Sequence, residues 1–282
     1  MYIKKAAVVG AGTMGADIAY VIASAGVPVV LRDVDAAQLD RARQHVSDLW
    51  NTRVKRGKMT ASQAADRLAN MRFSQDPQDL ADVSLAIEAV SERMEVKKSV
   101  FRELDRVLPP LALIASNTSA LSISELAAVT GRAKRVVGMH FFYPAHMMKL
   151  VEVIAGEETA RETIAAVMQF SEEIRKIPVK VKECPGFVVN RVLMAAMAEV
   201  LRFKEETGVD AADIDQAVTR GGLAPMGPLR LADALGLDVA WEVANTLSAA
   251  YGERFRPSQE FASLIAAGHY GIKSGQGFYS YR

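Results

Sequence analysis

Residues 6–15 read Ala-Ala-Val-Val-Gly-Ala-Gly-Thr-Met-Gly, and this stretch decides the fold. Its first four residues are apolar, as in a buried strand, and apolar residues then recur at helical spacing as far as Gly26. Gly10 permits a tight turn, Gly12 lets the backbone approach a pyrophosphate, and Gly15 lets a helix pack closely on a strand. A strand, a glycine loop and a helix in this order therefore indicate a dinucleotide site.

A second apolar strand, residues 27–31, is followed by Arg32 and Asp33. A carboxylate at this place accepts hydrogen bonds from a ribose diol and repels a 2′-phosphate, which favours NAD over NADP. The cation of Arg32 leaves some use of NADP open. Phosphates would meet the N–H groups at the start of the helix. The cofactor-binding residues predicted from this motif are Gly10, Gly12, Thr13, Met14, Gly15 and Asp33.

Strand-like and helical segments alternate over the first 183 residues. One helical stretch, residues 92–108, is stopped by Pro109 and Pro110. Strands this apolar are typical of parallel sheets covered by helices, so we expect an α/β fold with a Rossmann-type doubly wound parallel sheet over residues 1–183. The further strands are expected at residues 84–89, 113–116, 136–140, 150–154 and 177–181.

A helical hairpin is expected at residues 36–70, where apolar residues keep a helical period up to Val54 and Thr60 with Gln63 forms a capping box. Its tip is cationic and includes Lys58. This could be a binding surface or an ordinary solvated helix end, and the sequence favours neither.

The chain changes character after residue 183. Residues 184–282 are predicted to form an all-α domain, with a strand at most at residues 277–281. Its first helix carries an apolar stripe, Leu193, Met194, Met197 and Leu201, which serves a core or a subunit interface; core is the more common use. The helices are expected at residues 188–207, 211–219, 229–235 and 239–250.

Composition excludes several classes of protein. The 282 residues are 50% hydrophobic and 24% charged, which is a globular composition. Lys plus Arg (34) nearly balances Asp plus Glu (33), so nucleic acid is not an expected partner. No apolar run is long enough for a membrane span, and glycines and Asp17 break the one candidate signal sequence. The single cysteine, Cys184, fits a reducing compartment, so we expect a soluble, unprocessed, cytoplasmic protein.

His140 and Glu152 form the candidate catalytic pair. His140 ends a predicted strand at the carboxyl edge, where open α/β sheets bind ligands. Glu152 lies in an apolar strand, where an ionised carboxylate needs a partner. A lone histidine is more often structural, but next to a dinucleotide site this pair suits a general base that takes a hydroxyl proton while a hydride leaves.

Residues 116–119, Ser-Asn-Thr-Ser, follow another strand at the same edge. Their hydroxyl and amide groups could hold cofactor and substrate oxygens, or simply cap a helix. Asn190 is polar on an apolar helix, and is either a satisfied core amide or a donor to a substrate carbonyl. His45, His146 and His269 lack metal-ligand spacing, so no metal is expected, and Ser119 has no hydrolase context.

Nine motifs spread over nearly the whole chain make it resemble the 3-hydroxyacyl-CoA dehydrogenase family, with a length similar to that of the short 3-hydroxybutyryl-CoA dehydrogenases. They are Gly10-Ala-Gly-Thr-Met-Gly, Glu88-Ala-Val-Ser-Glu, Ser116-Asn-Thr-Ser, His140-Phe-Phe, Met148-Lys-Leu-Val-Glu-Val, Pro185-Gly-Phe-Val-Val-Asn-Arg, Pro225-Met-Gly-Pro, Gly236-Leu-Asp and Gly275-Gln-Gly-Phe-Tyr.

The resemblance implies a NAD-binding Rossmann domain, a helical domain that binds substrate and forms a homodimer, and an active site in the cleft between them. By motif, His140 corresponds to the catalytic base and Glu152 to its partner. Ser119 corresponds to the residue that binds the substrate's 3-oxygen, and Asn190 to an amide that completes the pocket.

The resemblance also extends the cofactor and substrate sites. The hairpin around Lys58 corresponds to the arm that contacts coenzyme A, whose phosphates suit its cations. The further cofactor contacts it implies are Glu92, Lys97 and Lys273, and Asn117 is expected to bind the cofactor because it follows the strand at residues 113–116.

The chain departs from the family next to the catalytic base. The family reads His-Phe-Phe-Asn-Pro, whereas Tyr143 stands at the fourth position here, and His146 stands where the family often has proline. The expected reaction is NAD-dependent oxidation of a short (S)-3-hydroxyacyl-CoA, or its reverse, with Tyr143 in the substrate site. The alternatives are a substrate without coenzyme A, such as a β-hydroxy acid or a pyridine carboxylate, and a non-catalytic NAD-binding protein.

Overall fold

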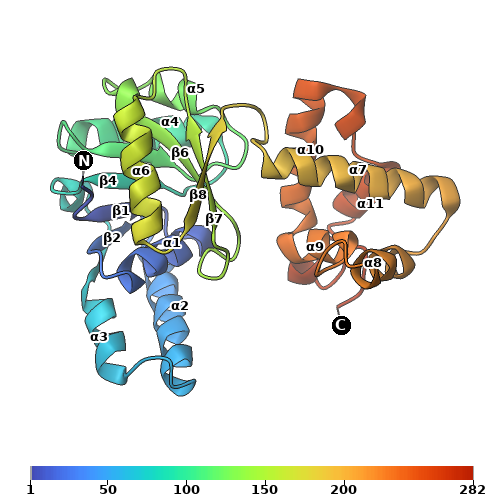
Figure 1. Ribbon diagram of the computed structural model, residues 1–282, viewed down its shortest axis with the longest axis horizontal. Helices are drawn as coiled ribbons and strands as arrows, with labels where there is room; N and C mark the ends of the chain where they lie inside the picture. The colour runs from blue at the N-terminus through green and yellow to red at the C-terminus, as the bar shows by residue number, and fades with distance from the viewer. Residues whose placement is uncertain (1, 282) are drawn as a thin grey trace. The chain divides into compact units, whose positions relative to one another are not determined.

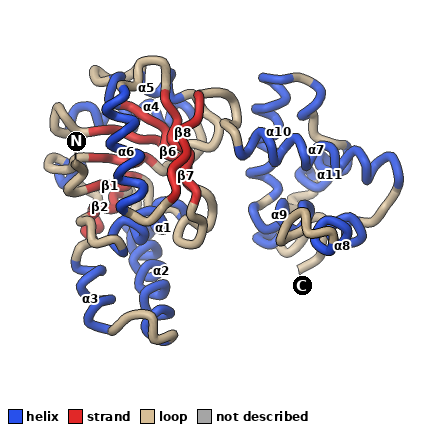
Figure 2. Tube along the Cα trace, in the orientation of Figure 1, coloured by secondary structure: helices blue, strands red, loops and turns tan. Residues whose placement is uncertain are grey.

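The computed structural model describes residues 2–281, and the chain divides into two compact units, Met1–Glu183 and Cys184–Arg282. Each unit is described by itself. All eight strands lie in the first unit, whereas the second is built from helices and loops (Figure 2). None of the described helices has the length and apolar character needed to cross a membrane.

The strands of the first unit form one sheet in the order β3-β2-β1-β4-β5-β6-β7-β8, and Figure 1 labels β1, β2, β4, β6, β7 and β8 of this sheet. The chain builds outward from β1 on both sides, as in a doubly wound fold. Neighbouring strands run parallel except β6 and β7, which are antiparallel. The strands are β1 (Ala6–Val9), β2 (Val29–Arg32), β3 (Met71–Ser74), β4 (Leu85–Glu88), β5 (Leu113–Ser116), β6 (Val136–Phe141), β7 (Leu150–Ala155) and β8 (Ile177–Lys182).

The central strands are buried along their whole length because helices cover the sheet. Every residue of β1, β2, β4, β5 and β6 is buried, which explains why these segments are apolar without alternation. The helices of this unit are α1 (Thr13–Ser24), α2 (Ala36–Lys55), α3 (Ala61–Ala69), α4 (Met94–Val107), α5 (Ile123–Ala127) and α6 (Arg161–Glu173), with the 3₁₀ turns η1 (Pro77–Leu80) and η2 (Ala133–Arg135).

The predicted Rossmann-type fold is confirmed, with two local differences. The antiparallel β7 makes the sheet mixed rather than wholly parallel. β3 was not predicted, because this four-residue strand has an exposed Arg72 and lacks an apolar pattern. The hairpin of α2 and α3 forms as expected, and Thr60 and Gln63 exchange both hydrogen bonds of the capping box.

The second unit is all-helical, as predicted. Of the apolar stripe, Met197 and Leu201 are buried in its core, whereas Leu193 is 45% exposed. The strand expected at residues 277–281 is wrong: this segment makes isolated bridges, and its backbone N–H groups at Phe278 and Tyr279 donate to the buried Asp233 carboxylate instead. The helices are α7 (Val189–Thr207), α8 (Ala211–Arg220), α9 (Pro228–Leu235), α10 (Leu237–Tyr251) and α11 (Gln259–Ala266), with η3 (Glu253–Phe255) and η4 (Ile272–Ser274).

Candidate active site

The glycine loop joins β1 to α1, and two of its glycines have no room for a side chain. Gly10 has a φ of +104°, and a Cβ there would lie 2.6 Å from the Ala89 carbonyl oxygen. A Cβ on Gly15 would lie 1.8 Å from the carbonyl oxygen of Gly10. The turn and the close packing of helix on strand therefore both require glycine, as the motif predicts.

The start of α1 is open to a ligand. A Cβ on Gly12 would have Gln38 Nε2 as its nearest neighbour, at 3.8 Å. Within residues 2–281, no side chain caps the first turn of this helix. The N–H groups of that turn and the positive end of the helix dipole suit a pyrophosphate. The loop thus fits NAD.

Asp33 follows β2 and ties the glycine loop to the end of that strand. Its Oδ2 accepts a hydrogen bond from the Ala11 N–H at 2.6 Å, and its Oδ1 accepts one from the Asp35 N–H at 3.0 Å. The carboxylate therefore lies against the loop expected to hold the cofactor. Its contact with the ribose diol stays a prediction.

Arg32 is committed to another partner. Its guanidinium makes a bidentate ion pair with Glu103 on α4, with N–O distances of 2.9 and 3.0 Å, and its side chain is 8% exposed. A buried, paired guanidinium is not available to neutralise a 2′-phosphate. This geometry weighs against the use of NADP that Arg32 left open.

His140 and Glu152 face each other across the antiparallel strands β6 and β7. The sheet register pairs these two residues directly. His140 Nδ1 lies 2.8 Å from Glu152 Oε2, and the two residues are 4% and 1% exposed. The predicted pair is therefore brought together by the sheet ladder itself, across a loop of eight residues, 142–149.

The geometry defines what this pair can do. With the Nδ1–H donating to the carboxylate, Nε2 is the nitrogen that accepts a proton. The imidazolium that results is stabilised by a carboxylate in a buried setting, where electrostatic interactions are stronger than in water. The ring of Phe142, the first residue of the loop, packs against the imidazole with a centroid separation of 4.5 Å. The pair thus has the form of a general base with its supporting acid.

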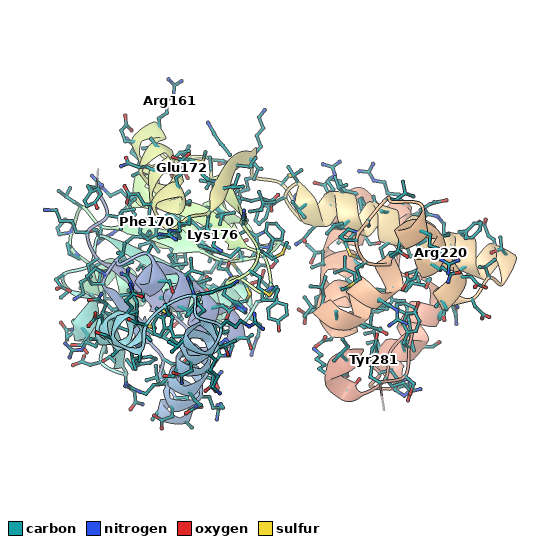
Figure 3. All side chains as sticks on the ribbon, turned by 60° about the horizontal axis from the view of Figure 1, so that its bottom comes forward. Arg161, Phe170, Glu172, Lys176, Arg220 and Tyr281 are labelled. Carbon is teal, nitrogen blue, oxygen red and sulfur yellow. The ribbon has the colours of Figure 1, made fainter. Side chains whose placement is uncertain are left out.

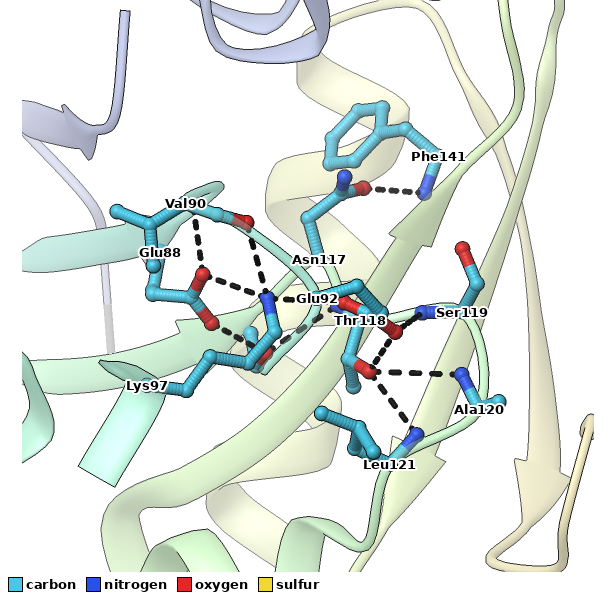
Figure 4. Close-up of polar contacts among 11 residues, drawn as sticks. Glu88, Val90, Glu92, Lys97, Asn117, Thr118, Ser119, Ala120, Leu121 and Phe141 are labelled. Carbon is cyan, nitrogen blue, oxygen red and sulfur yellow. Dashed lines mark hydrogen bonds and ion pairs between the residues drawn. The ribbon is translucent and has the colours of Figure 1, made fainter. Parts of the chain in front are cut away.

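The end of β5 brings several predicted residues beside β6 (Figure 4). Asn117 Oδ1 accepts a hydrogen bond from the N–H of Phe141, the residue after His140, at 2.9 Å. Glu92 accepts from the Ser119 N–H at 2.7 Å and from the Thr118 hydroxyl. Glu92 therefore fixes the backbone that carries Ser119. The cofactor and substrate roles of these residues stay predictions.

A charge cluster lies under this loop, in which Glu88 and Lys97 are buried and the Glu92 side chain is 32% exposed. Lys97 Nζ lies 2.7 Å from Glu88 Oε1 and 3.1 Å from Glu92 Oε2, and the lysine is 1% exposed (Figure 4). Glu88 also accepts from the Ser116 hydroxyl at 2.6 Å. Glu88 was not predicted as a site residue, although a glutamate at the end of an otherwise apolar strand is a signal for one. The position of Lys97 supports Glu92 from below, and its own contact with the cofactor stays a prediction.

The remaining predicted residues lie on the loop after β6, on the hairpin and in the second unit. Tyr143 is 49% exposed on the loop after β6, and Lys58 is exposed at the tip of the α2–α3 hairpin. Asn190 lies in the first turn of α7, and the Lys273 ammonium pairs with the Asp238 carboxylate; both belong to the second unit. Within residues 2–281, no group of three or more metal-binding side chains is arranged around a common point.

The fold and the glycine loop define an NAD-binding Rossmann domain, and comparison with known proteins gives the family of the chain. Residues 5–184 match the model of the 3-hydroxyacyl-CoA dehydrogenase NAD binding domain, and residues 186–281 match that of the C-terminal domain. The chain belongs to the 3-hydroxyacyl-CoA dehydrogenase family. The resemblance seen in the sequence, the class of enzyme and NAD as its cofactor are thereby confirmed.

Three similar proteins show how far the likeness extends. The 3-hydroxyadipyl-CoA dehydrogenase of Escherichia coli K12 is 42% identical over 99% of this chain, which spans 59% of that protein. The solved (S)-3-hydroxybutyryl-CoA dehydrogenase of Ralstonia eutropha is 38% identical, with a TM-score of 0.95 over 99% of both chains. A solved 5-formyl-3-hydroxy-2-methylpyridine 4-carboxylic acid 5-dehydrogenase is 35% identical, with a TM-score of 0.81 over 99% of this chain and 91% of its own.

Proposed function

We propose that this chain oxidises the 3-hydroxyl group of a short (S)-3-hydroxyacyl-CoA to the 3-oxo thioester with NAD, or catalyses the reverse reaction. The observation that carries the proposal is the buried His140–Glu152 pair at the carboxyl end of β6. The likeness to (S)-3-hydroxybutyryl-CoA dehydrogenase over the full length of both chains supports the substrate class.

The protein's part in the reaction is proton transfer and positioning. NAD supplies the hydride acceptor when bound. His140 Nε2 takes the proton of the 3-hydroxyl as the hydride leaves C3, and Glu152 holds the other ring nitrogen and stabilises the imidazolium. In the reverse direction the same nitrogen returns the proton to the 3-oxygen.

Ser119 and Asn190 are proposed to hold the substrate oxygens in line with His140. Ser119 lies on a segment whose backbone is fixed by Glu92, so its position is set before substrate arrives. Such positioning groups supply orientation rather than chemistry. Glu92, Lys97, Asn117 and Lys273 remain the proposed additional cofactor contacts.

The hairpin tip is proposed to bind the phosphates of coenzyme A. Lys58 lies between α2 and α3, exposed to solvent, with Lys55 and Arg56 close by in the chain. Exposed ammonium and guanidinium groups are good partners for phosphates.

The second unit is proposed to bind substrate and to form a homodimer. Its first helix, α7, exposes Val192, Leu193 and Phe203 by 63%, 45% and 48%. Large exposed apolar side chains on one helix are typical of an interface between subunits.

Sedimentation should therefore give twice the chain mass, and Val192→Glu should shift the measured mass toward that of the monomer. The protein is proposed to act in the cytoplasm, because its single cysteine suits a reducing compartment.

A substrate panel tests the proposed reaction most directly. Purified protein with NADH and acetoacetyl-CoA should consume NADH, and the matched variant His140→Gln should do so at least about a hundredfold more slowly. Activity with 3-hydroxyadipyl-CoA and NAD would extend the range to dicarboxylic acyl chains. If the protein turned over free β-hydroxy acids or pyridine aldehydes but no thioester, the proposed substrate class would be wrong, and the protein would still be a dehydrogenase.

The substrate without coenzyme A is kept as a second candidate because of Tyr143. This residue puts an exposed phenol ring just after the catalytic strand, where the family's asparagine offers a compact amide. The likeness to the pyridine carboxylic acid dehydrogenase supports this candidate too. NAD binding without turnover of any panel member would instead favour a non-catalytic protein.

A further inference from the structure

Asp17 is a buried carboxylate shared by two histidines. It lies one turn into α1, is 1% exposed, and its Oδ2 is 2.7 Å from Nδ1 of His146. Its Oδ1 is 2.8 Å from Nε2 of His45, which belongs to α2. The Asp17 carboxylate thus connects α1, the hairpin of α2 and α3, and the loop 142–149. The proposed proton transfer uses none of these three side chains.

The loop 142–149 is held from a second side by Lys176. This lysine follows α6 (labelled in Figure 3), and its ammonium donates to the carbonyl oxygens of Ala145 and Met148 at 2.5 and 2.7 Å. Burial lowers the pKa of Lys176, and the negative charge of Asp17 partly opposes this shift. Two buried charged groups of opposite sign therefore fix one eight-residue loop.

This loop begins next to the catalytic base and carries exposed apolar side chains. Phe142 packs on the His140 imidazole, and Tyr143, Met147 and Met148 are 49%, 70% and 43% exposed. Large apolar side chains grouped on an exposed surface mark a binding site more often than a free surface. Burying charged groups to hold such a loop carries a desolvation cost, which a binding role would explain.

We propose that the His146–Asp17 contact is a positioning element for substrate: it holds the loop so that Tyr143 and Met147 form an apolar wall for the acyl group beside His140. The inference rests on the proposed function and names what that site uses to bind the acyl chain. His146 and Asp17 act through the loop and touch no reacting atom.

The catalytic pair does not depend on this contact. His140 and Glu152 are fixed by the register of β6 and β7, whereas the loop between these strands depends on its side-chain anchors. Release of the loop should therefore weaken acyl binding and leave the proton transfer in place. In kinetic terms the effect falls on KM for the acyl substrate rather than on kcat.

The test compares His146→Ala with His45→Ala in the full chain. Both remove one imidazole from the same carboxylate, but only the first removes a side-chain anchor of the loop, which Lys176 and the backbone N–H of residue 146 still hold. His146→Ala should raise KM for acetoacetyl-CoA about tenfold, the size expected for a lost hydrogen bond to a charged group. It should leave kcat and KM for NADH unchanged, and His45→Ala should change none of the three by more than about twofold.

Asp17→Asn tests the same contact from its other end. It should raise KM at least as much as His146→Ala does, because Asp17 contacts the His146 ring, the His146 N–H and the His45 ring. The double variant should go no further than Asp17→Asn alone, because His146→Ala removes a contact that Asp17→Asn has already weakened. An unchanged KM in His146→Ala, or an equal fall in kcat for both histidine variants, would overturn the inference.

Hydrogen exchange separates this inference from the proposed function. Peptides covering residues 142–149 should exchange faster in His146→Ala than in the parent chain or in His45→Ala. If the parent chain turns over no thioester, the proposed function fails, whereas the exchange result still decides whether His146 holds the loop. Unchanged exchange in His146→Ala would contradict the anchoring.

Discussion

Buried carboxylates contact different kinds of partner in the two units of this protein. In the first unit Asp17, Glu88 and Glu152 each contact a histidine or lysine side chain. In the second unit Asp215 and Asp233 accept hydrogen bonds from backbone N–H groups and tyrosine hydroxyls. The difference between the units lies in the partner.

The carboxylates of the second unit organise its backbone. Asp215 on α8 accepts from the N–H groups of Leu229 and Arg230, both at 2.9 Å, in the first turn of α9. Asp233 accepts from the N–H groups of Phe278 and Tyr279 near the end of the chain. These contacts satisfy amides that never titrate, so they serve stability.

The partner decides what a carboxylate can contribute. An imidazole can change its charge near neutral pH, so a carboxylate beside it can assist proton transfer. An amide cannot. Neutralising a carboxylate in the first unit should therefore affect activity, and neutralising one in the second should affect stability.

The largest expected effect is on catalysis, from Glu152→Gln. An amide of the same size keeps the volume but loses the charge that stabilises the imidazolium. We expect kcat to fall about a hundredfold to a thousandfold, with little change in binding of NADH. Steady-state kinetics with NADH titration measures both, and the exposed Glu157→Gln is the control. A variant with parental kcat would remove Glu152 from the mechanism.

The next effect is on stability, from Asp233→Asn. Loss of the charge weakens the hydrogen bonds from Phe278, Tyr279 and Tyr281, so the free energy of unfolding should fall by about 2–3 kcal/mol. Denaturant unfolding followed by tryptophan fluorescence measures it, since Trp241 lies in this unit. The exposed Asp213→Asn on α8 should change it by less than about 0.5 kcal/mol. Equal changes in the free energy of unfolding for the two variants would contradict the stabilising role of the Asp233 carboxylate.

Asp33 sharpens the comparison, because it is a carboxylate of the first unit that accepts from backbone N–H groups. It lies at the proposed ribose site, so Asp33→Asn should weaken binding of NADH about tenfold through the lost charge–hydroxyl contact. Calorimetric titration measures this. A fall in stability with unchanged NADH affinity would show that Asp33 serves the loop alone.

The smallest effect is confined to alkaline pH. Burial, and then its hydrogen bond to Asp233, raise the pKa of Tyr281 to about 12 from 10.0. A phenol whose pKa is higher in the folded state stabilises the protein fully below pH 10.0, and this stability is lost as the pH rises toward about 12. Unfolding curves should show this loss, and Tyr281→Phe should make it smaller. An identical loss in both proteins would contradict the assignment.

Local patterns predicted much of this structure. The glycine loop, the buried strands and the capping box of Thr60 and Gln63 depend on residues close in sequence, so the sequence alone indicates them. The strand expected at residues 277–281 failed because its backbone bonds go to Asp233, about 45 residues earlier. That partner cannot be read from a local pattern.

The geometry of the site depends on contacts between residues that are far apart in the sequence, and the sequence did not predict that geometry. The sequence predicts that His140 and Glu152 pair, because a carboxylate in an apolar strand needs a partner. The antiparallel register that joins them is seen only in the structure. His45 and His146 looked scattered because their common partner, Asp17, is 28 and 129 residues away. No spacing rule connects residues so far apart.

The central claim, that His140 is the proton acceptor, is tested most directly by His140→Gln. Turnover of the true substrate and binding of NADH are measured on the same preparation. The account predicts that kcat falls by about a hundredfold or more while NADH affinity stays at the parental value. Full turnover by this variant would contradict it.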